Sequence, residues 1–317
     1  MKTRMNQLGM LAAVGMMLGI GSATQASTIL ELSFNNDQTV TTGTADNPYT
    51  MAPGDIAPAG MTTLRIDGAT GIAPAIVATP GTDNYGLQLS GHGGWDNYNG
   101  GYKITSDHRL TFGDHPEYGY FPDPTTKATG LTLDAVVKFN AASDGYILGK
   151  SGRSTWTDAY GYLKQNMWTG NQLQFTMALG TDMEKTITWN DSALIGDGLF
   201  HHIQGVFSYA EPTSTWSGGT PGVGTETLTP TGDSVVSLYV DGELKGSISY
   251  LETRKNYQMT LNGAGIGNGA NFWPTVTFNG VIDSVAIYNA PVSVVPEPAT
   301  LALLVCGGLM IAGRRKR

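Results

Sequence analysis

The sequence predicts an all-β fold, a two-sheet antiparallel sandwich, with a short segment of different character at each end. Charged residues make up only 14% of the 317 residues, and 43 glycines and 15 prolines supply turns throughout. Several stretches alternate apolar and polar residues with a period of two, which is typical of half-buried strands. Turn signals recur about every 8–12 residues, as a sandwich requires. The part between the terminal segments suits one large β domain.

The clearest alternation lies between Leu199 and Ser249. Residues 203–209 place an apolar residue or glycine on one face at every second position, and residues 236–240 do the same. The dipeptide Asp241-Gly242 favours a two-residue type I′ turn, because both central positions of that turn need positive φ. His201 and His202 are adjacent on a strand and point to opposite faces, so they do not easily chelate one metal and are interpreted as structural.

Further strands are expected before and after this hairpin. The segments 38–80 and 107–127 are instead interpreted as long irregular stretches, with a short strand piece at 76–78. Residues 210–233 are rich in threonine, glycine and proline and are interpreted as a long loop. The expected strands are residues 29–37, 85–91, 131–139, 146–150, 160–163, 173–179, 185–189 and 278–289.

Residues 1–26 have the form of a secretory signal peptide. Lys2 and Arg4 give a basic start, an apolar helical run extends from Leu8 to Ile20, and small residues precede Ser27. We expect cleavage after Ala26. The alternative is a retained anchor helix, for which the run is short compared with the ~20 residues of a membrane span.

Residues 294–317 form a second separate segment. Pro296, Glu297 and Pro298 precede an apolar run at 299–313, and four basic residues end the chain at 314–317. This pattern predicts a short transmembrane helix with its basic end in the cytoplasm. The arrangement resembles the PEP-CTERM sorting signal of Gram-negative bacteria, whose tail is processed by the membrane protease exosortase. The resemblance implies an exported protein at the cell surface or in the extracellular matrix, linked to exopolysaccharide production.

The central region resembles the laminin G-like domains of the concanavalin A-type jelly roll. The resemblance rests on His201-His202-Ile203 and the Leu238–Leu244 turn, and also on the strand Leu131–Phe139 and the closing segment Phe278–Ser293. It implies one jelly-roll domain over residues 27–293. It is specific for the fold and weak for function.

Charge excludes some partners. The formal net charge is −8, and removing both terminal segments leaves 12 basic and 25 acidic residues, a net charge of −13. Such a surface argues against nucleic acid or anionic lipid headgroups as partners, so membrane contact is expected only through the tail. The only cysteine, Cys306, lies in the tail, so the domain has no disulfide.

Two places suit carbohydrate recognition, in which ring faces stack on C–H bonds and amides bond hydroxyls. Trp95, Asn97 and Tyr98 lie in a glycine-rich stretch. A glycine-rich loop pinned by one buried tryptophan is the alternative there. Trp216, at the tip of the 210–233 segment, is the second place, where it would contact a glycan or another partner.

Calcium is the one cofactor that the sequence suggests. Asn35 and Asp37 end the first strand and offer oxygen ligands, although asparagine and aspartate also end strands by bonding their own backbone. Asp283 stands where many laminin G-like relatives have Asp-Glu, which implies a contribution to that family's calcium site. Here Ser284 replaces the second acid, a departure from the family pattern.

Three function classes remain after these observations. Glycoside hydrolases need two carboxylates at a fixed separation, and the Glu-x-Asp-x-Glu or Glu-x-Asp-x-x-Glu strand of related glucanases does not occur in the sequence. We therefore expect a non-enzymatic carbohydrate-binding or adhesion module, exported and sorted by an exosortase system. A structural matrix protein without a specific glycan is the alternative, and a glycoside hydrolase is the third.

Overall fold

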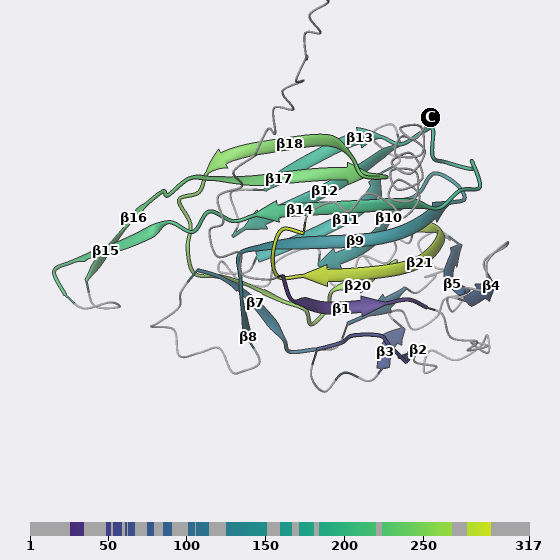
Figure 1. The fold of residues 1–317 in the computed structure, drawn as a ribbon, viewed down its shortest axis with the longest axis horizontal. Coiled ribbons are helices and arrows are strands. Elements are labelled where there is room, and N and C mark those ends of the chain that lie inside the picture. Colours follow the sequence, from purple (N-terminus) through teal and green to yellow (C-terminus); the bar gives the residue numbers. More distant parts are fainter. Residues whose placement is uncertain are drawn as a thin grey trace, which may run out of the picture.

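The computed structural model describes residues 26–34, 49–51, 53–58, 61, 63–66, 75–78, 85–90, 101–104, 106–113, 125–150, 159–166, 171–180, 184–219, 224–267 and 278–292. Within these residues every regular element is a strand, and two large antiparallel sheets lie face to face (Figure 1). The expected all-β sandwich is therefore confirmed. The two expected terminal helices lie outside the described residues, and no helix among those described is long and apolar enough to cross a membrane.

The first sheet has the order β18-β17-β14-β9-β21-β5-β4, and β1 pairs with β21. The first and closing strands of the domain thus lie side by side. Asp241 and Gly242, which join β17 to β18, both have positive φ (52° and 79°), as their sequence predicts. The strands are β1 (Thr28–Leu32), β4 (Ala75–Ala78), β5 (Tyr85–Ser90), β9 (Gly130–Phe139), β14 (His201–Ser208), β17 (Asp233–Val240), β18 (Glu243–Leu251) and β21 (Asn279–Tyr288).

The second sheet has the order β13-β12-β11-β10-β20-β6-β3-β2. Its long strands form a meander in which each strand pairs with the next along the chain. The strands are β2 (Tyr49–Thr50), β3 (Thr63–Ile66), β6 (Tyr102–Lys103), β10 (Asp144–Lys150), β11 (Ala159–Asn166), β12 (Gln172–Leu179), β13 (Lys185–Asn190) and β20 (Gly265–Ile266).

The core lies between the two sheets. Leu163 and Phe175 of the second sheet and Ile203 and Phe207 of the first are fully buried in one apolar cluster. The packing is close at Gly205, where an added Cβ would lie 2.3 Å from the Phe175 ring. Apolar residues at every second position thus face inward from both sheets, which leaves the alternate positions for the outer surfaces.

A small third sheet packs against the end of β14. Its order is β19-β7-β8, from β7 (Arg109–Phe112), β8 (Thr125–Ala128) and β19 (Tyr257–Thr260), and β7 and β8 are parallel. Phe112 packs against Phe207 and Tyr209, with ring centroids 5.7 Å away in each case. The irregular stretch expected at 107–127 therefore contains the strand β7 and the start of β8.

Residues 210–233 are not the long loop that their composition predicts. They contain β15 (Thr213–Ser217) and β16 (Thr225–Thr229), which pair with each other as a two-stranded ribbon. The ribbon projects away from the sandwich (Figure 1). Threonine is β-branched and favours extended backbone, and threonine at every second position outweighs the glycines and prolines that flank the strands.

Candidate functional site

The outer surface of β10–β13 carries polar and aromatic side chains in register across four strands. One row consists of Tyr146, Lys164, Gln174 and Thr188, which are successive cross-strand partners. The next row towards the strand ends runs from Asp144 to Asn190. We call this surface the tyrosine face, and define it by these two rows and their neighbours: Asp144, Tyr146, Tyr160, Tyr162, Lys164, Asn166, Gln172, Gln174, Thr176, Glu184, Thr186, Thr188 and Asn190.

Strand alternation places these residues together. On β11, Leu163 faces the core, so Tyr160, Tyr162 and Lys164 point to the other side. The Tyr162 ring meets the Tyr146 ring edge-on at 4.9 Å and lies nearly parallel to the Tyr160 ring at 6.4 Å. Three rings from two adjacent strands thus form one aromatic cluster, the arrangement in which flat apolar faces and polar hydroxyls lie next to each other.

Charged groups at the tyrosine face are held by neighbours. Lys164 Nζ lies 2.7 Å from an Asp144 carboxylate oxygen and 5.2 Å from the centre of the Tyr146 ring. The Glu184 carboxylate accepts hydrogen bonds from the Tyr160 hydroxyl (2.7 Å) and the Thr186 hydroxyl (3.1 Å). These contacts fix the side chains in place, so the surface is organised before any ligand arrives.

Electrostatics keep the central tyrosine neutral. Burial raises the pKa of the Tyr162 hydroxyl, a hydrogen bond with Thr176 lowers it, and the carboxylates of Glu184 and Asp144 raise it; the net pKa lies above its ordinary value. A neutral phenol can both donate and accept a hydrogen bond. Glu184, Thr188 and Asn190 are exposed, and Tyr162 and Lys164 are partly buried. Tyr146, Tyr160, Gln174 and Thr176 are buried, so the accessible part of the face runs from Tyr162 and Lys164 towards β13.

Only part of the predicted carbohydrate site can be located. Trp95, Asn97 and Tyr98 lie outside the described residues. Trp216 is on β15, opposite Glu226, and its side chain is partly buried rather than fully exposed. Trp216 belongs to the projecting ribbon, while the tyrosine face belongs to the second sheet, and no strand pairing joins the two.

The predicted calcium site is likewise only partly described. Asp283 lies in β21 at a point where the register with β9 shifts between Ile282 and Ser284, which marks a β-bulge. Bulges re-aim side chains, and burial raises the pKa of the Asp283 carboxyl. Asn35 and Asp37 lie outside the described residues. Among the residues that are described, no group of three or more His, Cys, Asp or Glu side chains could hold a metal ion.

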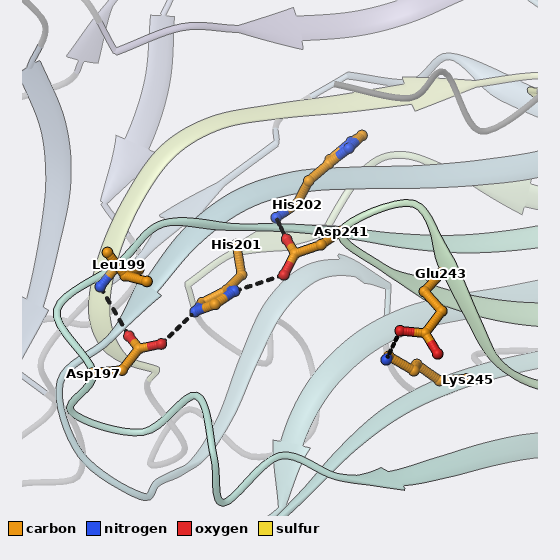
Figure 2. Close-up of polar contacts among 7 residues, drawn as sticks. All are labelled: Asp197, Leu199, His201, His202, Asp241, Glu243 and Lys245. Carbon is orange, nitrogen blue, oxygen red and sulfur yellow. Dashed lines mark hydrogen bonds and ion pairs between the residues drawn. The ribbon is translucent and has the colours of Figure 1, made fainter. Parts of the chain in front are cut away.

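The two side chains of the histidine pair at the start of β14 have different partners, and Figure 2 shows those of His201. His201 is held between two carboxylates: Nδ1 lies 2.8 Å from Asp241 Oδ2, and Nε2 lies 2.9 Å from Asp197 Oδ2. His202, on the opposite face, contacts Asp134 at 2.9 Å. Because both ring nitrogens of His201 are hydrogen-bonded to carboxylates, the imidazole links the segment before β14 to the β17–β18 turn and has no nitrogen left to act as a base.

Sequence reasoning missed the tyrosine face although its signal was present. Tyr160, Tyr162 and Lys164 alternate with Gly161 and Leu163, and this alternation implies an aromatic surface opposite the core face. The alternation was interpreted only as evidence for a strand. A polar and aromatic outer face on one strand is common. A site forms only because the side chains of β11 line up with those of β10, β12 and β13.

The fold and the tyrosine face define the protein as a two-sheet antiparallel β-sandwich with a polar, aromatic outer surface. The family model Laminin_G_3, described as the concanavalin A-like lectin/glucanases superfamily, matches residues 223–294. That match covers the chain from the second strand of the ribbon, β16, to the closing strand and supports the jelly-roll domain expected from sequence. No curated protein matches the chain.

Three solved structures illustrate the likeness at low identity. A pentraxin from Limulus polyphemus is 16% identical, with a TM-score of 0.34, over 53% of this chain and 67% of its own. The Ruminococcus gnavus IT-sialidase CBM40 bound to alpha2,3 sialyllactose is 14% identical, with a TM-score of 0.32, over 52% and 79%. Domains LG4-5 of mouse laminin alpha1 are 12% identical, with a TM-score of 0.36, over 59% and 40%.

Proposed function

We propose that this protein is an exported carbohydrate-binding surface module that holds a glycan on the tyrosine face. The observation that carries the proposal is the cross-strand row of Tyr146, Lys164, Gln174 and Thr188, beside which the Tyr162 ring packs on Tyr146. The description of the matching family model, which names lectins and glucanases, agrees with this class of ligand.

The chemistry of the face suits a sugar ring. A saccharide has C–H faces that stack on aromatic rings and hydroxyls that need both donors and acceptors. Tyr162 supplies a partly exposed ring, and the exposed Thr188 and Asn190 supply a hydroxyl and an amide. Binding rather than hydrolysis is favoured because the carboxylate of Glu184 already accepts two hydroxyl hydrogen bonds, and Asp144 is paired with Lys164.

The terminal segments support export. A signal peptide at residues 1–26 and the Pro296-Glu297-Pro298 tail together imply passage across the inner membrane and processing by an exosortase. The mature protein would then lie at the cell surface or in the extracellular matrix, where exopolysaccharide is the available ligand. The tail would be its contact with the membrane, transient or retained.

The test is a binding screen of the full-length protein against polysaccharides and oligosaccharides, followed by isothermal titration calorimetry. We expect Tyr162→Ala to weaken glycan binding about tenfold, since one ring of an aromatic anchor contributes roughly 1.4 kcal/mol. The control is Tyr239→Ala, a partly exposed tyrosine of the first sheet, which should leave affinity unchanged.

Other results would overturn the proposal in distinct ways. Loss of binding in Trp95→Ala or Trp216→Ala, with Tyr162→Ala unaffected, would move the site to the residues that sequence alone suggests. The absence of any glycan ligand, with and without Ca²⁺, would leave a structural matrix protein as the function. Release of reducing sugar from a bound glycan would make the protein a hydrolase.

A further inference from the structure

The ribbon of β15 and β16 is a sheet without a core. Along both strands exposed residues alternate with half-buried ones, and none of the ten is buried. One face holds six hydroxyl side chains in opposed pairs: Thr213 with Thr229, Thr215 with Thr227, and Ser217 with Thr225. An isolated two-stranded hairpin is marginally stable in water, and independent stability needs three or more strands with a hydrophobic face.

The ribbon is fixed at its base but not along its length. Glu211 lies 3.0 Å from Lys127 and 3.2 Å from Lys255, and its backbone carbonyl accepts a hydrogen bond from the Thr231 hydroxyl. The Ala210 amide donates to the Ser234 hydroxyl at 3.0 Å. Beyond this anchor, no other strand of the described residues pairs with β15 or β16, so each has one open edge.

The two open edges differ in charge. The sequence of β15 is Thr-Ser-Thr-Trp-Ser, without a charged residue, whereas β16 carries Glu226. The Glu226 carboxylate accepts a hydrogen bond from the Ser214 hydroxyl at 2.6 Å. In a domain whose formal net charge is −13, most surfaces of two copies repel each other. The β15 edge is uncharged, so copies can approach there at little electrostatic cost.

We propose that β15 pairs with β15 of a second copy of this chain, antiparallel and about a two-fold axis at Thr215. Thr215 then lies opposite its own counterpart, Ser214 opposite Trp216, and Thr213 opposite Ser217. No like charges oppose each other in this register. The result is a continuous four-stranded sheet, β16-β15-β15-β16, whose face opposite the threonines brings together Trp216 and Leu228 of both copies. The two-fold axis makes the contact self-complementary and closed.

Cysteine cross-linking tests the register. Full-length protein carrying Cys306→Ser and Thr215→Cys should form a disulfide-linked dimer on mild oxidation, because opposed residues of antiparallel strands have Cβ atoms about 4.5–5.5 Å apart. The control, Cys306→Ser with Thr227→Cys, places an equally exposed thiol on β16, which is the far edge in the dimer, and should cross-link at least tenfold more slowly.

A charge variant tests the association itself. Analytical ultracentrifugation of the full-length protein should give a dimer that Thr215→Lys weakens about fivefold or more, since two lysines then face each other across the axis. Thr227→Lys adds the same charge away from the axis and should have a smaller effect. A monomer at all concentrations overturns the proposal. So does a dimer that neither lysine variant weakens, and so does cross-linking of Thr227→Cys at the same rate as Thr215→Cys.

Discussion

His201 is held between two carboxylates, and replacing it should cost stability in a pH-dependent way. Its ring joins Asp197, in the segment before β14, to Asp241, in the turn between β17 and β18 (Figure 2). Asp241 also accepts the His202 amide at 2.9 Å, and Asp197 accepts the Leu199 amide at 2.8 Å. His201→Gln removes the cation and can keep one of the two ring contacts.

The size of the effect follows from the exposure of the partners. A hydrogen bond to a charged group contributes about 1.5–3 kcal/mol. The His201 side chain is 8% exposed, but Asp197 is 26% and Asp241 44% exposed, so solvent screens both contacts. We therefore expect His201→Gln to lower the free energy of unfolding by about 1–2 kcal/mol where the imidazole is charged.

The pH dependence has a definite sign. Burial lowers the pKa of His201, but the hydrogen bonds and charges of Asp241 and Asp197 raise it further, so the net pKa lies above its ordinary value of 6.5. A raised pKa gives stability that is complete below pH 6.5 and is lost as the pH rises through the folded-state pKa. The pKa of Asp197 is lowered, so its contribution is lost only in acid, below its ordinary value of 3.8.

Urea denaturation of wild type and His201→Gln at pH 5.5 and pH 9 measures this difference. The penalty should be largest at pH 5.5 and smaller at pH 9. The comparison of variants is necessary because burial lowers the pKa of His108, whose contribution to stability has the opposite pH dependence. An equal penalty at both pH values would refute the idea that His201 acts as a charged tie.

Gly205→Ala should cost about 1–3 kcal/mol of stability by calorimetry, because its Cβ would overlap the Phe175 ring, whereas Gly232→Ala, with nothing nearer than 4.0 Å, should be nearly neutral. If the calcium site that the sequence suggests exists, the melting temperature will be higher with Ca²⁺ than with chelator, and Asp283→Asn will remove the difference; equal temperatures for wild type would exclude the site. Intact-mass analysis should find the exported protein without residues 1–26, and a full precursor at the surface would contradict this.

The strands of the first sheet were predictable because local signals and tertiary packing agree there. Residues 203–209 alternate with period two, and Asp241-Gly242 has the positive φ values that its turn requires. The ribbon was not predicted because threonine, glycine and proline also dominate loops. Its strand signal, a threonine or serine at every second position, has no apolar face, and hydrophobic alternation is the pattern that reveals a strand.

The tyrosine face could not be derived from sequence for a different reason. Lys164 and Asp144 are 2.7 Å apart because β10 and β11 pair in one register, and a shift by one residue would send every side chain of β11 to the opposite surface. The carboxylate of Glu184, which directly precedes β13, accepts a hydrogen bond from Tyr160 of β11, across the intervening strand β12. Each strand taken alone has the alternation of an ordinary sandwich strand. The site can therefore be recognised only when the register of all four strands is known.

The two proposals together predict avidity. If β15 joins two copies, each dimer presents two tyrosine faces, and a long polysaccharide can bind both, which commonly strengthens binding by ~10²-fold or more when the spacing allows it. Thr215→Lys should then weaken binding to a polymer while leaving affinity for a short oligosaccharide unchanged, since the ribbon and the tyrosine face share no strand. Tyr162→Ala should weaken both. If Thr215→Lys reduces oligosaccharide affinity as much as polymer affinity, the ribbon contacts sugar directly, and the separation of binding from assembly is wrong.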